Sequence, residues 1–98
     1  MIRHVSVLTF VDGATDSQIG AIETALATLP ARLPQLRAYA FGRDLALADT
    51  NAHFAVVADF DDRAGYEAYR DDPEHRRILA EFIRPVLASR AAVQYDVS

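Results

Sequence analysis

The order in which strand-like and helix-like patterns follow one another is the strongest constraint on how this chain folds. Residues 2–11 are rich in β-branched side chains, which predicts a strand. Thr15 and Gln18 then fit a capping box, in which each side chain bonds the backbone of the other residue. A helix is therefore expected to begin after Thr15, to continue to about residue 29 and to end at Pro30.

The rest of the chain continues this alternation. Short segments rich in apolar residues predict three more strands, over residues 36–43, 53–60 and 91–97. Between the last two strands, Asp62 is expected to cap a short helix. Asp72 and Pro73 suit the cap and first position of a second helix, and Pro85 is expected to kink or break it.

The resulting order is β-α-β-β-α-β, which is typical of the ferredoxin-like arrangement. We therefore predict one α+β domain over residues 1–98, with a four-stranded antiparallel sheet and helices on one face. Apolar side chains occur on both faces of the predicted strands, so the second face also needs cover. Two such sheets packed face to face would provide it, and a two-fold homodimer is expected.

Charge and composition exclude several classes of partner. The chain has 14 acidic and 10 basic residues and a formal net charge of −4, so nucleic acid is not an expected partner. It has no cysteine, which excludes disulfides and thiolate chemistry and is compatible with the cytoplasm. No apolar run reaches the roughly 20 residues of a membrane span, so no membrane partner is expected. The histidines lack metal-ligand spacing, and we predict neither a metal site nor a cofactor.

Two histidines occupy positions where chemistry is conceivable. His75 follows Pro73 by two residues, and a helix N-terminus disfavours a charged imidazolium. A neutral imidazole suits a general base near pH 7, but a packed histidine would satisfy the same pattern. His4 shares a strand face with Ser6 and therefore needs a polar partner. Tyr69 is open to the same two interpretations, as pocket hydroxyl or core aromatic.

Four segments together resemble the stress-responsive dimeric α/β-barrel (Dabb) family across essentially the whole chain. They are the opening Ile2-Arg3-His4-Val5, then Phe41-Gly42-Arg43-Asp44-Leu45, Asp59-Phe60-Asp61-Asp62, and Tyr69-Arg70-Asp71-Asp72-Pro73-Glu74-His75. The last is similar to the family's Tyr-x-x-His-Pro-x-His segment. The resemblance implies a barrel formed by two sheets, with a cavity in each protomer between sheet and helices.

The family's plant polyketide (olivetolic acid) cyclases imply roles for three residues. By motif position, His75 corresponds to the general base, Tyr69 to the group that anchors a carbonyl, and His4 to a histidine of the same cavity. The chain departs from the cyclases at Asp72, at Phe54 and at Leu26, which stand where those enzymes have two histidines and a tyrosine. The residues expected to line the pocket are Ser6, Leu26, Phe54, Tyr66, Leu79 and Phe82.

Three functions remain open from the sequence. The first is a small-molecule-binding dimer that acts as a polyketide cyclase or lyase by intramolecular aldol chemistry. Its ligand would be a small apolar, aromatic or polyketide-like molecule. The second is a non-catalytic, stress-responsive binding or assembly protein. The third is a cofactorless monooxygenase, by analogy with other dimeric ferredoxin-like barrels.

Overall fold

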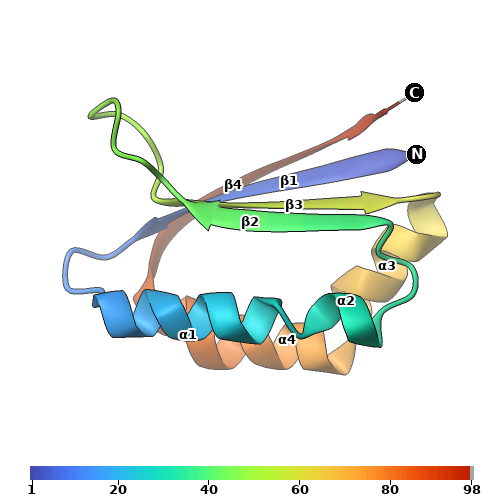
Figure 1. Cartoon of the computed structure of the whole chain (residues 1–98), viewed down its shortest axis with the longest axis horizontal. Coiled ribbons are helices and arrows are strands. Elements are labelled where there is room, and N and C mark those ends of the chain that lie inside the picture. The colour runs from blue at the N-terminus through green and yellow to red at the C-terminus, as the bar shows by residue number, and fades with distance from the viewer. Residues whose placement is uncertain (98) are drawn as a thin grey trace.

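A computed structural model describes residues 1–97 and has two layers, a sheet above a layer of helices (Figure 1). Four antiparallel strands lie in the order β2-β3-β1-β4. The strands are β1 (Ile2–Phe10), β2 (Ala38–Arg43), β3 (Phe54–Phe60) and β4 (Leu87–Asp96). The helices α1 (Asp16–Leu26), α2 (Leu29–Arg32), α3 (Arg63–Asp71) and α4 (Pro73–Ile78) all lie on one side of the sheet. The ferredoxin-like α+β prediction is thereby confirmed.

The predicted caps begin the helices. Thr15 Oγ1 accepts the Gln18 amide hydrogen at 3.1 Å, and Gln18 Oε1 accepts that of Thr15 at 2.9 Å, so the capping box is complete. Asp62 accepts from the Gly65 amide and caps α3, and Asp72 accepts from the His75 amide and caps α4. Local sequence therefore sets where α1, α3 and α4 start.

Two helix ends differ from the expected boundaries. Pro30 does not simply end the first helix, because it lies in the first turn of α2, where its missing N–H costs nothing. After α4, the chain forms a π-helical turn over Leu79–Ile83 (η1) and a 3-10 turn over Arg84–Val86 (η2). Pro85 cannot donate the hydrogen bond that an α-helix needs there, and the expected break is confirmed. Strand β4 begins at Leu87, four residues before the predicted start.

The inner face of the sheet packs on the helices. Strand pairing places His4 opposite Ala58 and Gln94, and Ser6 opposite Val56 and Ala92. The hydrophobic core forms between these layers, and its largest fully buried side chains are Phe54, Phe60, Ile22, Leu26, Leu29 and Ile78. The inner face is therefore apolar at the β3 side and polar around His4 and Ser6.

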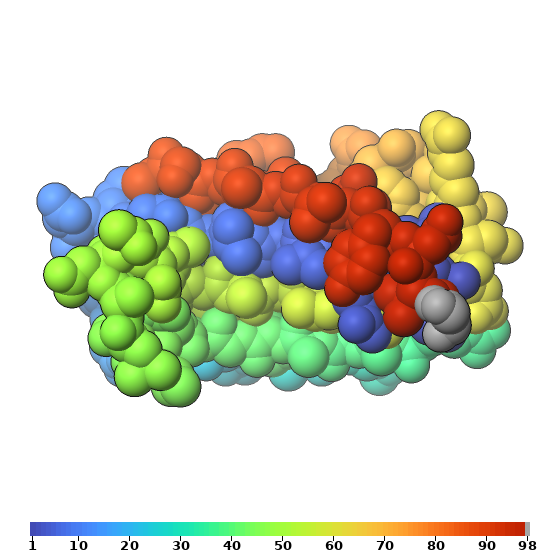
Figure 2. Space-filling view, turned by 90° about the horizontal axis from the view of Figure 1, so that it is seen from above, coloured from blue at the N-terminus to red at the C-terminus, as the bar shows by residue number. Residues whose placement is uncertain are grey.

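The outer face of the sheet carries no helix within residues 1–97 (Figure 1). Pairing aligns one apolar row across all four strands, formed by Ala40, Val57, Val5 and Val93. Val93 is 56% exposed, and Tyr95 on the same strand is 48% exposed. Figure 2 shows this face, with the segment between β2 and β3 (green) at one end. An apolar surface of this kind marks an interface.

The helices of the described residues do not include one long and apolar enough to cross a membrane.

Candidate active site

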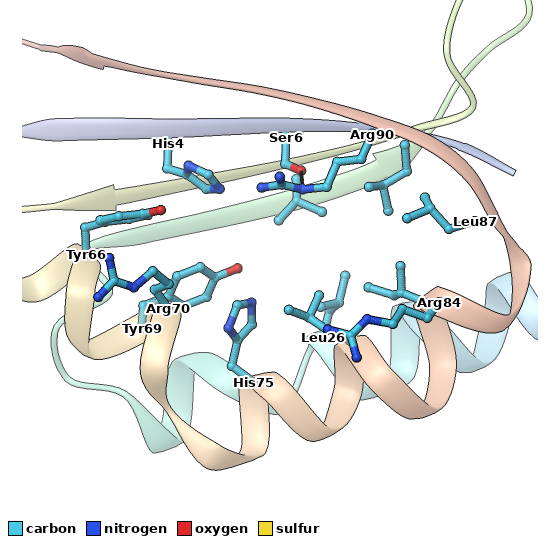
Figure 3. A pocket seen from close by; sticks show the side chains of 14 residues that line it. His4, Ser6, Leu26, Tyr66, Tyr69, Arg70, His75, Arg84, Leu87 and Arg90 are labelled. Atoms are coloured by element: carbon cyan, nitrogen blue, oxygen red, sulfur yellow. Dashed lines mark hydrogen bonds between the residues drawn. The ribbon is translucent and has the colours of Figure 1, made fainter.

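A cavity of about 410 Å³ lies between the inner face of the sheet and the helices (Figure 3). Strands β1, β3 and β4 line it from the sheet side, and α1, α3, α4 and the turns after α4 line it from the other. Its lining residues are His4, Ser6, Leu8, Leu26, Val56, Tyr66, Tyr69, Arg70, His75, Leu79, Ile83, Arg84, Leu87 and Arg90. The volume suits a small molecule with one or two rings.

His75 lies in the wall of this cavity. The residue is only 7% exposed, and its Nδ1 has no hydrogen-bond partner among residues 1–97. Burial lowers the pKa of the imidazole, and the backbone carbonyls of Arg70 and Tyr69 and the carboxylate of Asp72 only partly oppose this shift. His75 is therefore neutral at pH 7, and its unpartnered nitrogen is unusual for a buried polar atom.

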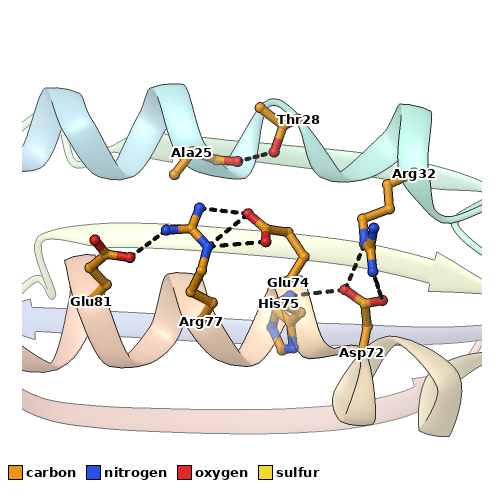
Figure 4. A network of polar contacts seen from close by, with 8 residues as sticks. All are labelled: Ala25, Thr28, Arg32, Asp72, Glu74, His75, Arg77 and Glu81. Atoms are coloured by element: carbon orange, nitrogen blue, oxygen red, sulfur yellow. Dashed lines mark hydrogen bonds and ion pairs between the residues drawn. The ribbon is translucent and has the colours of Figure 1, made fainter.

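The start of α4 holds His75 in place (Figure 4). Asp72 Oδ2 accepts the His75 amide hydrogen at 2.9 Å, and Arg32 of α2 donates to both carboxylate oxygens of Asp72 at 3.1 and 3.2 Å. The Arg32 guanidinium lowers the pKa of Asp72 and keeps the cap ionised. On the outer surface of α4, Arg77 pairs with both Glu74 and Glu81. The position of His75 thus depends on a contact between two helices.

Tyr69 lies directly against His75, which sequence spacing alone does not establish. The two ring centroids are 4.0 Å apart, because the break between α3 and α4 folds the chain back on itself. The Tyr69 hydroxyl lies 3.4 Å from that of Tyr39. Burial raises the pKa of Tyr69, so the phenol remains protonated and able to donate.

His4 faces the same cavity from β1 and is 4% exposed. Its Nδ1 lies 2.7 Å from Gln94 Nε2, and its ring centroid lies 5.3 Å from that of Tyr66. Burial lowers the pKa of His4, and the positive charge of Arg90 lowers it further. Unlike His75, His4 has a polar partner that fixes its ring, which suits an orienting role.

Seven of the residues singled out in the sequence lie in the cavity wall, and two do not. Phe54 belongs to the core, where it contacts Phe10 and Phe41, so it does not line the cavity as expected. Phe82 also lies outside the wall, with the Arg77 guanidinium 5.7 Å from its ring centroid, because the π-helical turn rotates it away from the cavity.

The arginines of the cavity were not predicted from the sequence. Arg70, Arg84 and Arg90 all contribute to its wall. Arg84 lies in the 3-10 turn that follows the π-helical turn, and there it contributes to the cavity wall. Side chains of β4 alternate between the two faces of the sheet, and Arg90 is on the inner face. The strand starts early enough to pair Arg90 with Leu8. The two-residue period of β4, extended toward its true start, would have placed Arg90 on the inner face.

Acidification is expected to destabilise the protein through the two cavity histidines. The pKa of each histidine in the folded protein lies below the unfolded value of about 6.5. At a pH between the folded and the unfolded pKa, the unfolded state therefore binds more protons than the folded state. The free energy of unfolding should therefore fall as the pH drops from 7 to 5. Urea unfolding at several pH values measures this, and a free energy that stays flat or rises would contradict the assigned shifts.

Within residues 1–97, no group of three or more histidine, cysteine or carboxylate side chains is arranged to hold a metal ion.

The model of the Dabb family, described as the stress responsive A/B barrel domain, matches residues 2–97. A dimeric ferredoxin-like protein of unknown function from Thermobifida fusca is 49% identical, with a TM-score of 0.91 over 98% of this chain and 90% of that one. Among curated proteins, none matches the chain.

Two more distant structures share the fold alone. The hydroxynitrile lyase of Passiflora edulis is 18% identical, with a TM-score of 0.84 over 99% of this chain and 93% of that one. A protein described as an antibiotic biosynthesis monooxygenase is 15% identical, with a TM-score of 0.79 over 100% of this chain and 99% of that one. The family match covers nearly the whole chain, and the protein belongs to the Dabb family of stress responsive A/B barrel domains.

Proposed function

We propose that the cavity binds a small carbonyl compound and that His75 removes a proton from the carbon next to the carbonyl group. The observation that carries this proposal is the neutral imidazole of His75 in the cavity wall, with the Tyr69 ring packed against it. A general base must be unprotonated at the working pH, and a neutral imidazole meets that need. The chemistry belongs to the lyase class, which includes the intramolecular aldol reaction expected from the sequence.

The groups next to His75 can stabilise the negative charge that proton removal creates on the substrate. Removing the proton leaves negative charge on the carbonyl oxygen, and a protonated phenol nearby stabilises it. Tyr69 is that phenol, because burial keeps its hydroxyl protonated and its ring touches His75. His4, fixed by Gln94, would orient the substrate from the opposite wall. The removed proton stays on His75 until the new carbon–carbon bond forms and the product oxygen takes it up.

The open cavity favours a ligand-binding function over a purely structural one. In a structural protein, large side chains such as Phe54 and Phe82 would be expected to fill this space. Both pack elsewhere, and about 410 Å³ remains. The lyase named among the fold relatives supports acid–base chemistry on such a scaffold by analogy. The monooxygenase alternative has only the fold in its support.

We further propose that two copies pair through their outer sheet faces to form the α/β barrel. The apolar row of Ala40, Val57, Val5 and Val93 supplies the contact surface. The Thermobifida fusca relative, described as dimeric, supports this assembly. The cavity lies on the inner face of each sheet, so pairing would leave both cavities intact.

Hydrogen–deuterium exchange tests the proton-removal step without knowledge of the natural substrate. Propiophenone in D2O exchanges its acidic carbon-bound hydrogens slowly at neutral pH, and NMR follows the loss of that signal. Removal of the proton by His75 and return of a deuteron from solvent would accelerate the exchange. Positioned general bases contribute about 10²-fold or more. If the wild-type protein leaves the rate at that of buffer, the proposed lyase chemistry is wrong.

A further inference from the structure

Most basic residues of this chain form ion pairs with carboxylates, and the two that do not are found in one place. All ten are arginines. Eight of them pair with carboxylates, namely Arg3, Arg32, Arg37, Arg43, Arg63, Arg70, Arg76 and Arg77. Within residues 1–97, the two arginines without a carboxylate partner are Arg84 and Arg90, and both line the cavity.

The cavity wall is positive although the chain as a whole is acidic. The formal net charge is −4, yet the lining includes three arginines and neither aspartate nor glutamate. Arg70 is already neutralised by Asp71 and Glu67. The only side-chain partner of Arg90 in the described chain is Ser6, whose Oγ accepts from Nε at 3.1 Å and leaves both terminal nitrogens of the guanidinium available.

The two arginines belong to opposite layers of the cavity. Figure 3 shows Arg90 extending from β4 beneath the sheet and Arg84 approaching from the helical side, with apolar residues such as Leu26 and Leu87 around them. The other wall of the cavity carries His75, Tyr69 and Tyr66. The positive charge of Arg90 acts on both His4 and Tyr69, so an anion bound at Arg90 would lie next to the proposed acid–base groups.

We propose that Arg84 and Arg90 bind an oxyanion on an otherwise apolar or aromatic ligand. The guanidinium fork matches carboxylate and phosphate oxygens, and apolar walls accommodate the rest of such a molecule. This inference rests on the proposed function of the cavity and specifies its substrate class as an organic acid or a phosphate monoester. A bound anion would also replace the missing carboxylate partners of both arginines.

Three probes of similar size separate charge recognition from simple apolar binding. We would titrate the wild-type protein with 4-butylbenzoate, 4-butylphenyl phosphate and neutral 4-butylbenzamide by isothermal calorimetry. One of the two anions is expected to bind about tenfold more tightly than the amide, since charge-assisted hydrogen bonds are stronger than neutral ones. The tighter anion identifies the preferred group, and the preference should shrink at high salt because both arginines are exposed to solvent.

Arg84→Gln and Arg90→Gln are each expected to lose most of the preference for the anion while binding of the amide stays unchanged. The amide therefore reports that the variant cavity is still folded. Arg63→Gln is the matched control, because it removes the same charge from α3 outside the cavity wall and should keep the preference.

The outcomes distinguish this inference from the proposed function. Equal binding of all three probes to the wild-type protein would overturn the anion site and leave the cavity proposal standing. An anion preference that survives in both glutamine variants would also overturn it. Failure of all three probes to bind would contradict both the anion site and the small-molecule function.

Discussion

Replacement of His75 by leucine is expected to abolish the accelerated hydrogen–deuterium exchange and at the same time to raise the unfolding temperature. Exchange should fall about 10²-fold or more, to the rate in buffer, because leucine cannot accept a proton. Stability should rise because the buried Nδ1 has no partner within residues 1–97, and such an atom costs about 1–3 kcal/mol. A gain of about 1 kcal/mol corresponds to about 4 °C or more in a domain of this size.

His53 provides the matched control for this variant. It is an exposed histidine outside the cavity wall, and its Nδ1 accepts the Phe10 amide hydrogen at 2.9 Å. His53→Leu should therefore keep the exchange rate and lower the unfolding temperature, the opposite of His75→Leu. If His75→Leu retained the exchange, another base would be acting. If it lowered the unfolding temperature, His75 would be a structural residue.

Replacement of Val57 by aspartate is expected to convert the proposed dimer into monomers. Val57 lies in the apolar row of the outer face, paired with Val5 on one side and Ala40 on the other. Two-fold pairing would bury an unpaired carboxylate from each copy, and each buried charge costs several kcal/mol. Light scattering after gel filtration should give twice the 10.8 kDa chain mass for the wild type and about the chain mass for the variant.

Val57→Thr is the control for the dimer experiment, because threonine has nearly the shape of valine and carries no charge. It should remain a dimer. A wild-type protein that runs at the single-chain mass would contradict the proposed pairing of outer faces. A Val57→Asp variant that stays dimeric would place the interface elsewhere.

Local sequence signals predict most of this fold. The capping box of Thr15 and Gln18 and the caps at Asp62 and Asp72 are short-range interactions, and α1, α3 and α4 begin where they predict. Strand periodicity likewise places His4 and Ser6 on one face, and that face is buried in the structure. These features depend on neighbours a few residues away, so the sequence states them directly.

The cavity was less predictable because it depends on how the elements pack. The contact between Tyr69 and His75 follows from the angle between α3 and α4. Arg84 reaches the cavity because a π-helical turn and a 3-10 turn change the helical phase after Ile78. The missing partner of His75 Nδ1 is visible only when every neighbouring donor and acceptor has been placed. Such features arise from tertiary packing, which periodicity does not encode.

The most direct test of the account is an NMR titration that follows the rings of all three histidines while 4-butylbenzoate is added to the wild-type protein. His4 and His75 lie in the cavity wall, and His53 lies outside it as an internal reference. The account predicts saturable shifts of the His4 and His75 ring signals, with His53 unchanged. Ring signals of His4 and His75 that do not move, or that move no more than those of His53, would contradict a binding site built around His75.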